Sequence, residues 1–242
     1  MLRSIFFPTR NNIVLWITTI YLLMLLYLGK ISGLTVLFVY FLETIIIGLF
    51  NIVKIYLVVK LGAKEKNNSK YIFKYWIILF FIFHYGFFVG VQSIFGFTLF
   101  EIEGSVDIGE PFHLIENYTK LLSFDGIQYA LPVIFFNHMS WFVMGFLKEK
   151  KYHFFTAQEM LFKPYLRIFI QQFVVIISVA LMLLTQQAIL VGIILIVLRL
   201  FVDLSLEAIK VNSQFLDYLA EKMANEKTSK EAMKRQLIVF TE

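Results

Sequence analysis

The chain has 242 residues, of which 59% are hydrophobic, 18% are aromatic and 16% are charged, with a net charge of +5 at pH 7. Soluble domains are about 45–50% apolar and about 25% charged, so this composition excludes an ordinary soluble protein and indicates a membrane protein. There is no cysteine, which excludes disulfides, thiolate metal sites, iron–sulfur clusters and cysteine nucleophiles. The basic residues lie in short segments between apolar runs, so we interpret them as topology signals and expect no nucleic-acid partner.

Six segments contain the run of about 20 mostly apolar residues that a membrane-spanning helix needs. In chain order they cover residues 12–29, 34–60, 71–97, 127–147, 165–185 and 188–206. The first of these segments follows a basic stretch, as the apolar part of a cleaved signal peptide would. Its apolar run is long and no small-residue cleavage site follows, so we expect a retained span. The fifth and sixth spans are joined by "TQQ" and should form a tight helical hairpin.

The predicted fold is therefore all-α: a polytopic membrane helix bundle of about six transmembrane helices. We expect residues 1–206 to form the transmembrane domain and residues 207–242 a charged helical tail. Lys and Arg are concentrated after the second span, after the fourth span and in the tail, whereas the connection after the fifth span has no basic residue. Basic loops face the cytoplasm, so this alternation predicts that both termini are cytoplasmic.

Two segments outside the spans have a recognisable pattern. Residues 98–125 form an acidic external loop, in which "GEPFHLIENYTKLL" indicates a turn followed by a short interfacial helix. This loop is either a solvated connector or a lip that attracts cations. The tail over 207–235 has oppositely charged pairs four residues apart, such as Glu231/Arg235, and these support a solvated helix.

Ionisable side chains occur inside several of the predicted spans. Such residues are costly in a bilayer and are usually functional. At 1.5 Å per residue, Glu43 lies about 13 Å into the second span, His84 about 18–20 Å into the third and His138 about 17 Å into the fourth. All three are near the middle of a core about 30 Å thick, so we predict a shared buried polar site. It could bind a divalent metal ion, relay protons, or only join helices by hydrogen bonds.

Further polar residues in the spans are candidates for a network around this site. They are Thr44, Asn51, Tyr85, Asn137, Gln171, Gln172, Arg199 and Asp203. Hydrogen-bond partners of this kind fix the orientation of an imidazole. Arg199 and Asp203 are four residues apart on one helical face and can neutralise each other, or Arg199 can pair with Glu43 on another helix. Gly86 and Gly90 form a G-x-x-x-G pattern, which predicts close helix packing within the bundle.

Several of these residues belong to stretches that together resemble a known family. The stretches are "YFLETIIIGLFNIVKI", "FHYGFF", "NHMSWF", "KPYLRIFI" and "RLFVDLSLEA". They are similar to an uncharacterised bacterial and archaeal family of integral membrane proteins, a domain of unknown function, from the second span to the sixth. The matching residues are Glu43, Thr44, Asn51, His84, Tyr85, Gly86, His138, Pro164, Tyr165, Arg167 and Asp203.

The resemblance implies the multi-pass architecture and a bacterial or archaeal plasma membrane, but no activity. Two positions depart from the family pattern. Relatives carry a further histidine in the fifth span and another four residues after the late aspartate, where this chain has Gln171 or Gln172 and Glu207. The loss of these potential ligands weakens the case for a centre with several histidines.

Three classes of function therefore stay open, and we favour the first. It is a transporter or carrier for a small ligand, an ion or protons, with the buried polar residues lining its path. The second is an intramembrane enzyme with a metal bound by Glu43, His84 and His138. The third is a structural subunit, whose partner would be a second copy or another membrane protein.

Overall fold

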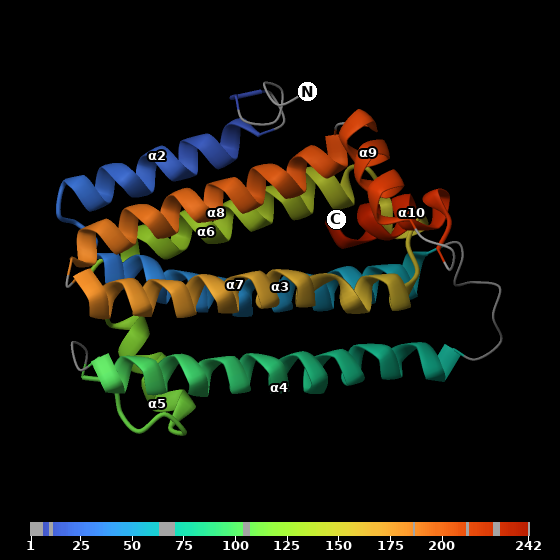
Figure 1. The fold of residues 1–242 in the computed structure, drawn as a ribbon. Coiled ribbons are helices and arrows are strands. Elements are labelled where there is room, and N and C mark those ends of the chain that lie inside the picture. The colour runs from blue at the N-terminus through green and yellow to red at the C-terminus, as the bar shows by residue number, and fades with distance from the viewer. Residues whose placement is uncertain are drawn as a thin grey trace.

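The computed structural model describes residues 7–9, 12–62, 71–103, 107–185, 187–211, 213–224 and 228–241. Within these residues the regular elements are helices (Figure 1). They are α2 (Ile13–Tyr27), α3 (Gly33–Leu61), α4 (Tyr71–Glu103), α5 (Leu114–Leu122), α6 (Ile127–Ser140), the π-helix η2 (Trp141–Leu147), the short 3₁₀ helix η3 (Lys151–His153), α7 (Ala157–Thr185), α8 (Ala188–Val211), α9 (Ser213–Met223) and α10 (Lys230–Thr241). The long helices run side by side, with α5 at one end of the bundle and α9 and α10 at the other (Figure 1).

Five stretches are long and apolar enough to cross a membrane. They are Gly33–Leu61, Tyr75–Thr98, Ile127–Leu147, Ile168–Thr185 and Ala188–Ile209, and they correspond to the second to sixth predicted spans. The first predicted span is α2, an apolar helix of 15 residues. This is shorter than the run of about 20 residues that crosses a bilayer unaided. The all-helical architecture is confirmed, and by helix length five of the six predicted spans qualify.

Helix α3 is the central helix of the bundle. In its most apolar stretch 67% of the residues are buried, compared with 14–39% in the other four spanning candidates. It packs against α4, α6, α7 and α8. Its first turn is held by a capping box: the Ser32 hydroxyl accepts from the Thr35 N–H at 3.0 Å, and the Ser32 N–H donates to Thr35 Oγ1 at 3.1 Å. The Thr35 hydroxyl also donates to the Asp125 carbonyl at 3.0 Å, which fixes α3 against the start of α6.

Glycine allows α3 and α8 to approach closely at this end of the bundle. A Cβ on Gly33 would lie 1.8 Å from the Ala188 carbonyl oxygen, and one on Gly192 would lie 2.9 Å from the Gly33 Cα. The predicted packing of Gly86 and Gly90 within the bundle is wrong. Among the described residues, a Cβ on Gly86 would meet nothing within 4 Å, and one on Gly90 would meet the Leu114 side chain alone, at 3.8 Å. Gly33 and Gly192 therefore bring α3 and α8 together, and on α4 the glycine that allows close packing is Gly96, where a Cβ would lie 2.1 Å from the Phe41 ring of α3.

A polar layer separates two apolar clusters along α3. The cluster nearest α5 contains residues 36–42, and the Phe38 ring there lies 4.9 Å from that of Phe100 on α4. The cluster nearest α9 and α10 contains Ile55, Val58 and Val59, packed with Phe81, Phe146 and Met160. Between them α3 buries Glu43, Thr44 and Asn51, which are at most 4% exposed. Polar groups buried between two apolar layers need partners within the protein.

The tail folds back on the bundle and does not extend as one solvated helix. Helices α9 and α10 pack on each other, and α10 contacts α7 and α8. Lys234 bonds Asp217 at 2.6 Å, joining the two tail helices. Arg235 bonds Glu159 at the start of α7, with Nη2 2.5 Å from Oε1, so its predicted pairing with Glu231 is wrong. The charges of the tail serve tertiary contacts because α9 and α10 form a hairpin.

The predicted external loop is shorter than expected. Helix α4 continues through residues 98–103, which we expected to lie in the loop. The short helix predicted after the turn is present as α5, and its Asn117 amide donates to the Glu110 carbonyl at 2.9 Å. The hydrophobic residues of 98–103 extend the helical pattern, and Phe100 is fully buried against α3, which explains why the helix continues.

Candidate functional site

Glu43, His138 and Arg199 come from three helices that begin at the same end of the bundle (Figure 1). Glu43 is ten positions after the first residue of α3, and His138 and Arg199 are each eleven positions after the first residues of α6 and α8. At 1.5 Å per residue, all three lie about 15–17 Å from that end. Equal depth on three packed helices brings these charged side chains to one place.

The three side chains form a buried ionic cluster on a single carboxylate oxygen. Glu43 Oε1 lies 2.5 Å from His138 Nε2 and 2.7 Å from Arg199 Nη2. The side chains of Glu43, Arg199 and His138 are only 4%, 11% and 15% exposed. The carboxylate therefore has a permanent cation on one side and, on the other, an imidazole that can hold or release a proton.

Asp203 and Tyr40 complete the surroundings of Arg199. Arg199 Nε donates to Asp203 Oδ2 at 3.4 Å, so the guanidinium faces two carboxylates. The Tyr40 ring packs against it, with 5.1 Å between Arg199 Cζ and the ring centroid, and the Tyr40 hydroxyl donates to the Leu195 carbonyl at 3.3 Å. The sequence left open whether Arg199 pairs with Asp203 or with Glu43, and both pairings are present. The planar guanidinium has several N–H donors and can bond both carboxylates at once.

His84 has a different partner from the one expected. Its Nδ1 lies 2.5 Å from the Tyr165 hydroxyl on α7, and its ring stacks on Phe80 at 4.9 Å. The next residue, Tyr85, faces α3 and donates to the Thr44 carbonyl at 2.7 Å. Successive helical residues are about 100° apart around the axis, so His84 faces α7 when Tyr85 faces α3. Within the described residues, no group of three His, Asp or Glu side chains has a geometry that could hold a metal ion.

Asn51, Thr44 and Gln172 lie outside the ionic cluster, and of these Asn51 joins two helices. The Asn51 amide donates to the Met160 carbonyl at 3.0 Å, linking α3 to α7. The Thr44 hydroxyl donates to the Tyr40 carbonyl at 3.3 Å within α3. Gln172 Oε1 is buried with no partner in the described part of the chain, and the side chain of Gln171 lies outside the described residues.

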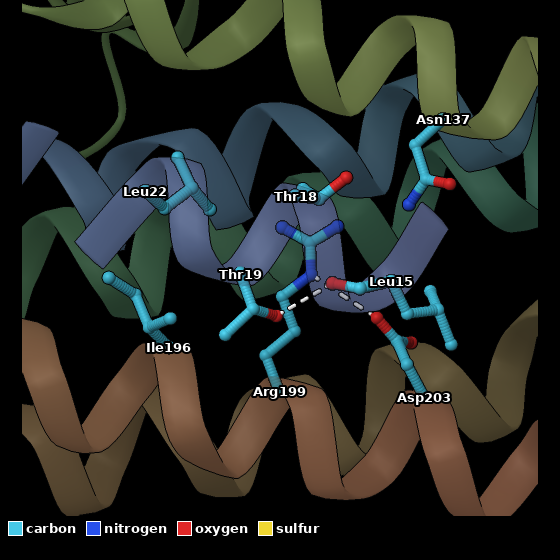
Figure 2. Close-up of a pocket in the computed structure, with 8 residues that line it drawn as sticks. All are labelled: Leu15, Thr18, Thr19, Leu22, Asn137, Ile196, Arg199 and Asp203. Atoms are coloured by element: carbon cyan, nitrogen blue, oxygen red, sulfur yellow. Dashed lines mark hydrogen bonds and ion pairs between the residues drawn. The ribbon is translucent and has the colours of Figure 1, made fainter. Parts of the chain in front are cut away.

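A small pocket lies beside the ionic cluster, under α2. It is lined by Leu15, Thr18, Thr19 and Leu22 of α2, Asn137 of α6, and Ile196, Arg199 and Asp203 of α8 (Figure 2). It holds about 230 Å³ of space between atoms, including its open mouth. The Trp141 indole N–H donates to Asn137 Oδ1 at 3.1 Å, which leaves the Asn137 NH₂ for the pocket. Trp141 is also the first residue of η2, and π-helical segments often occur at functional sites.

Sequence reasoning missed Tyr40 and Thr18 as members of the site. Tyr40 precedes Glu43 by three residues, so the helical period already placed both on one face of α3. Thr18 gave a weaker signal, because a threonine within a helix usually bonds its own backbone, as the neighbouring Thr19 does with the Leu15 carbonyl at 2.8 Å.

In the described part of the chain the regular elements are helices, and five of them are long and apolar enough to cross a membrane, which is compatible with a membrane protein. The chain belongs to DUF6498, a family of unknown function, whose model matches residues 1–235. No curated protein and no solved structure matches the chain. The family membership confirms the expected resemblance to an uncharacterised family.

Proposed function

We propose that this protein is a membrane carrier that moves protons through the buried cluster of Glu43, His138 and Arg199. The observation that carries the proposal is the shared oxygen, Glu43 Oε1, which contacts an imidazole nitrogen and a guanidinium nitrogen at 2.5 and 2.7 Å. A proton can reside on the imidazole or on the carboxylate, which are in direct hydrogen-bond contact. Arg199 supplies a fixed positive charge that keeps the buried carboxylate from being an isolated anion.

The position of the cluster supports this function. Chains of Asp, Glu and His side chains within spans are the usual elements of proton relays in pumps and transporters. The cluster lies in the polar layer of α3, between the two apolar clusters, and α3 is the most buried of the spanning candidates. A polar group needed only to join two helices would not require a carboxylate, a guanidinium and an imidazole at one depth, with the second carboxylate, Asp203, one turn further along α8.

The orientation that fits the loop charges has both termini in the cytoplasm, with α2 as a sixth, short membrane-inserted helix. Lys60, Lys148, Lys151 and Lys230 are at the end of the bundle that carries α9 and α10, while Glu116 is on α5 at the opposite end. This separation of charge follows the positive-inside rule. In the cysteine-free chain, Lys148→Cys and Glu116→Cys should react with an impermeant thiol reagent from opposite sides of sealed vesicles.

Proton flux into reconstituted liposomes tests the function. A potassium gradient with valinomycin sets the membrane potential, and a trapped pH-sensitive dye reports entry of protons. We expect wild-type vesicles to acidify well above protein-free vesicles, and Glu43→Gln and His138→Gln to fall to the protein-free rate. Glu116→Gln and His113→Gln, in the exposed segment around α5, are matched controls and should conduct like wild type. Wild-type flux equal to that of protein-free vesicles would refute the proposal.

A further inference from the structure

The pocket under α2 concentrates hydrogen-bonding groups that have no protein partner. Two of the three guanidinium nitrogens of Arg199 bond Glu43 and Asp203, but Nη1 is buried without a partner in the described part of the chain. An unpaired N–H of a buried guanidinium is costly, more so than that of a neutral group. Figure 2 shows the guanidinium extending from α8 toward Thr18 on α2.

Two further groups on the same pocket are also unpaired among the described residues. The hydroxyl of Thr18 makes no hydrogen bond, although Thr18 is 7% exposed and its neighbour Thr19 bonds its own helix. The Asn137 NH₂ has no partner either, because Trp141 engages the oxygen of this amide. Three unpaired polar groups, from α2, α6 and α8, therefore line one small pocket. This number suits a buried water molecule, which typically makes about three hydrogen bonds.

We infer that the pocket lined by Thr18, Asn137 and Arg199 binds water and is the route by which protons reach Glu43 and His138. Water can satisfy all three groups, since it accepts from Arg199 Nη1 and from the Asn137 NH₂ and donates to the Thr18 hydroxyl. An anion fits less well, because Glu43 and Asp203 already balance more than the charge of Arg199. This inference rests on the proposed function for the identity of the transported species.

The position of α2 explains how water gains entry. Helix α2 has 15 residues and extends from the α5 end only part of the way along α8 (Figure 1). Leu15 and Thr18, near the first turn of α2, line the pocket together with Asp203. The ionic cluster thus lies under the N-terminal half of a short helix and not under the middle of a long one.

Cysteine labelling tests water access independently of transport, because the chain has no cysteine of its own. Thr18→Cys and Ile20→Cys are each reconstituted in liposomes and treated with a charged methanethiosulfonate. Ile20 is the matched control, since it lies two positions along α2 with its side chain 60% exposed on the outer surface. We expect Thr18→Cys to react about tenfold faster or more, because the reactive thiolate forms in water and not in lipid.

Proton flux then tests the route. Thr18→Val removes the hydroxyl and keeps the shape, while Thr98→Val, outside the pocket, removes a hydroxyl that bonds only its own helix, at the Ile94 carbonyl. We expect a flux about tenfold lower for Thr18→Val, because one ordered hydrogen bond of about 1.4 kcal/mol corresponds to a factor of ten. Thr98→Val should conduct like wild type, and Thr18→Ser should restore the flux.

The outcomes separate the two proposals. Equal labelling of Thr18→Cys and Ile20→Cys would overturn the water pocket, even if the wild-type protein conducts protons. Fast labelling with equal flux in Thr18→Val and Thr98→Val would overturn the route. Fast labelling in a protein without proton flux would overturn the proposed function and leave the water pocket standing.

Discussion

The carboxylate of Glu43 and the guanidinium of Arg199 lie 2.7 Å apart inside the bundle, although 156 positions separate them in the chain. Each charge is costly to bury, and their mutual attraction offsets this cost only while both are present. The pair therefore links the stability of α3 and α8 to the chemistry of the site.

Removal of one partner of the pair should destabilise the protein strongly. Arg199→Met leaves Glu43 without its cation, and we expect a loss of about 3–5 kcal/mol in the free energy of unfolding, measured by denaturant titration in bicelles. Arg235→Met, which breaks a partly exposed ion pair in the tail, should cost no more than about 1 kcal/mol. The double variant Arg199→Met/Glu43→Gln should lose less than the sum of its single variants, by about 0.5–3 kcal/mol. Additive losses would show that the two side chains do not interact.

Glycine substitutions should distinguish the two helix faces. Gly33→Ala places a Cβ against the Ala188 carbonyl, and we expect it to destabilise by about 1–3 kcal/mol because the backbones must move apart. Gly86→Ala meets open space and should be neutral, or up to about 1 kcal/mol stabilising, since alanine is the better helix former. Thermal unfolding in detergent measures both variants. A large loss with Gly86→Ala would indicate that this face of α4 packs against another molecule.

Replacement of His84 should leave the ionic cluster intact. His84→Gln breaks the hydrogen bond to Tyr165, which we expect to cost about 0.6 kcal/mol, the average for such bonds in membranes. Proton flux should stay at the wild-type level. Elemental analysis of the wild-type protein and of His84→Gln should give the same metal content. Stoichiometric metal that is lost with His84→Gln would instead support a metal site containing this histidine.

Acidification should release the tail from α7. Partial burial raises the pKa of Glu159, but hydrogen bonds from Thr156 and Arg235 lower this pKa by more than burial raises it. The pKa of Glu159 therefore lies below the ordinary 4.5. Since the folded-state pKa is depressed, the stabilisation is fully present above pH 4.5 and is lost as the pH falls through the folded value. Spin labels at Gln158→Cys and Gln236→Cys would report the distance between α7 and α10.

We expect that distance to lengthen below pH 4.5 and at high salt, because both conditions weaken the bond between Arg235 and Glu159. The matched control is Glu159→Gln in the same labelled background, in which this part of the pH dependence should disappear. An unchanged distance at low pH in the parent protein would show that apolar contacts alone hold the tail.

The sequence by itself determined the helices, their apolar character and the common depth of Glu43 and His138. These follow from quantities that are local to a helix: its hydrophobic run and its rise of 1.5 Å per residue. Family membership also followed from the residues, since the quoted stretches fall within the matched range.

Only the tertiary structure decided which faces meet. The depth of a residue in the membrane does not say which way its side chain points around the helix axis. In the folded protein Tyr85 points toward α3 and His84 points toward Tyr165 on α7. Arg199 of α8 can reach Glu43 of α3 because Gly33 and Gly192 let these two helices approach closely. The two helices are far apart in the chain, so the sequence alone did not show this contact. The predicted trio of Glu43, His84 and His138 thus became a cluster of Glu43, His138 and Arg199, since the facing of side chains is set by packing between distant helices.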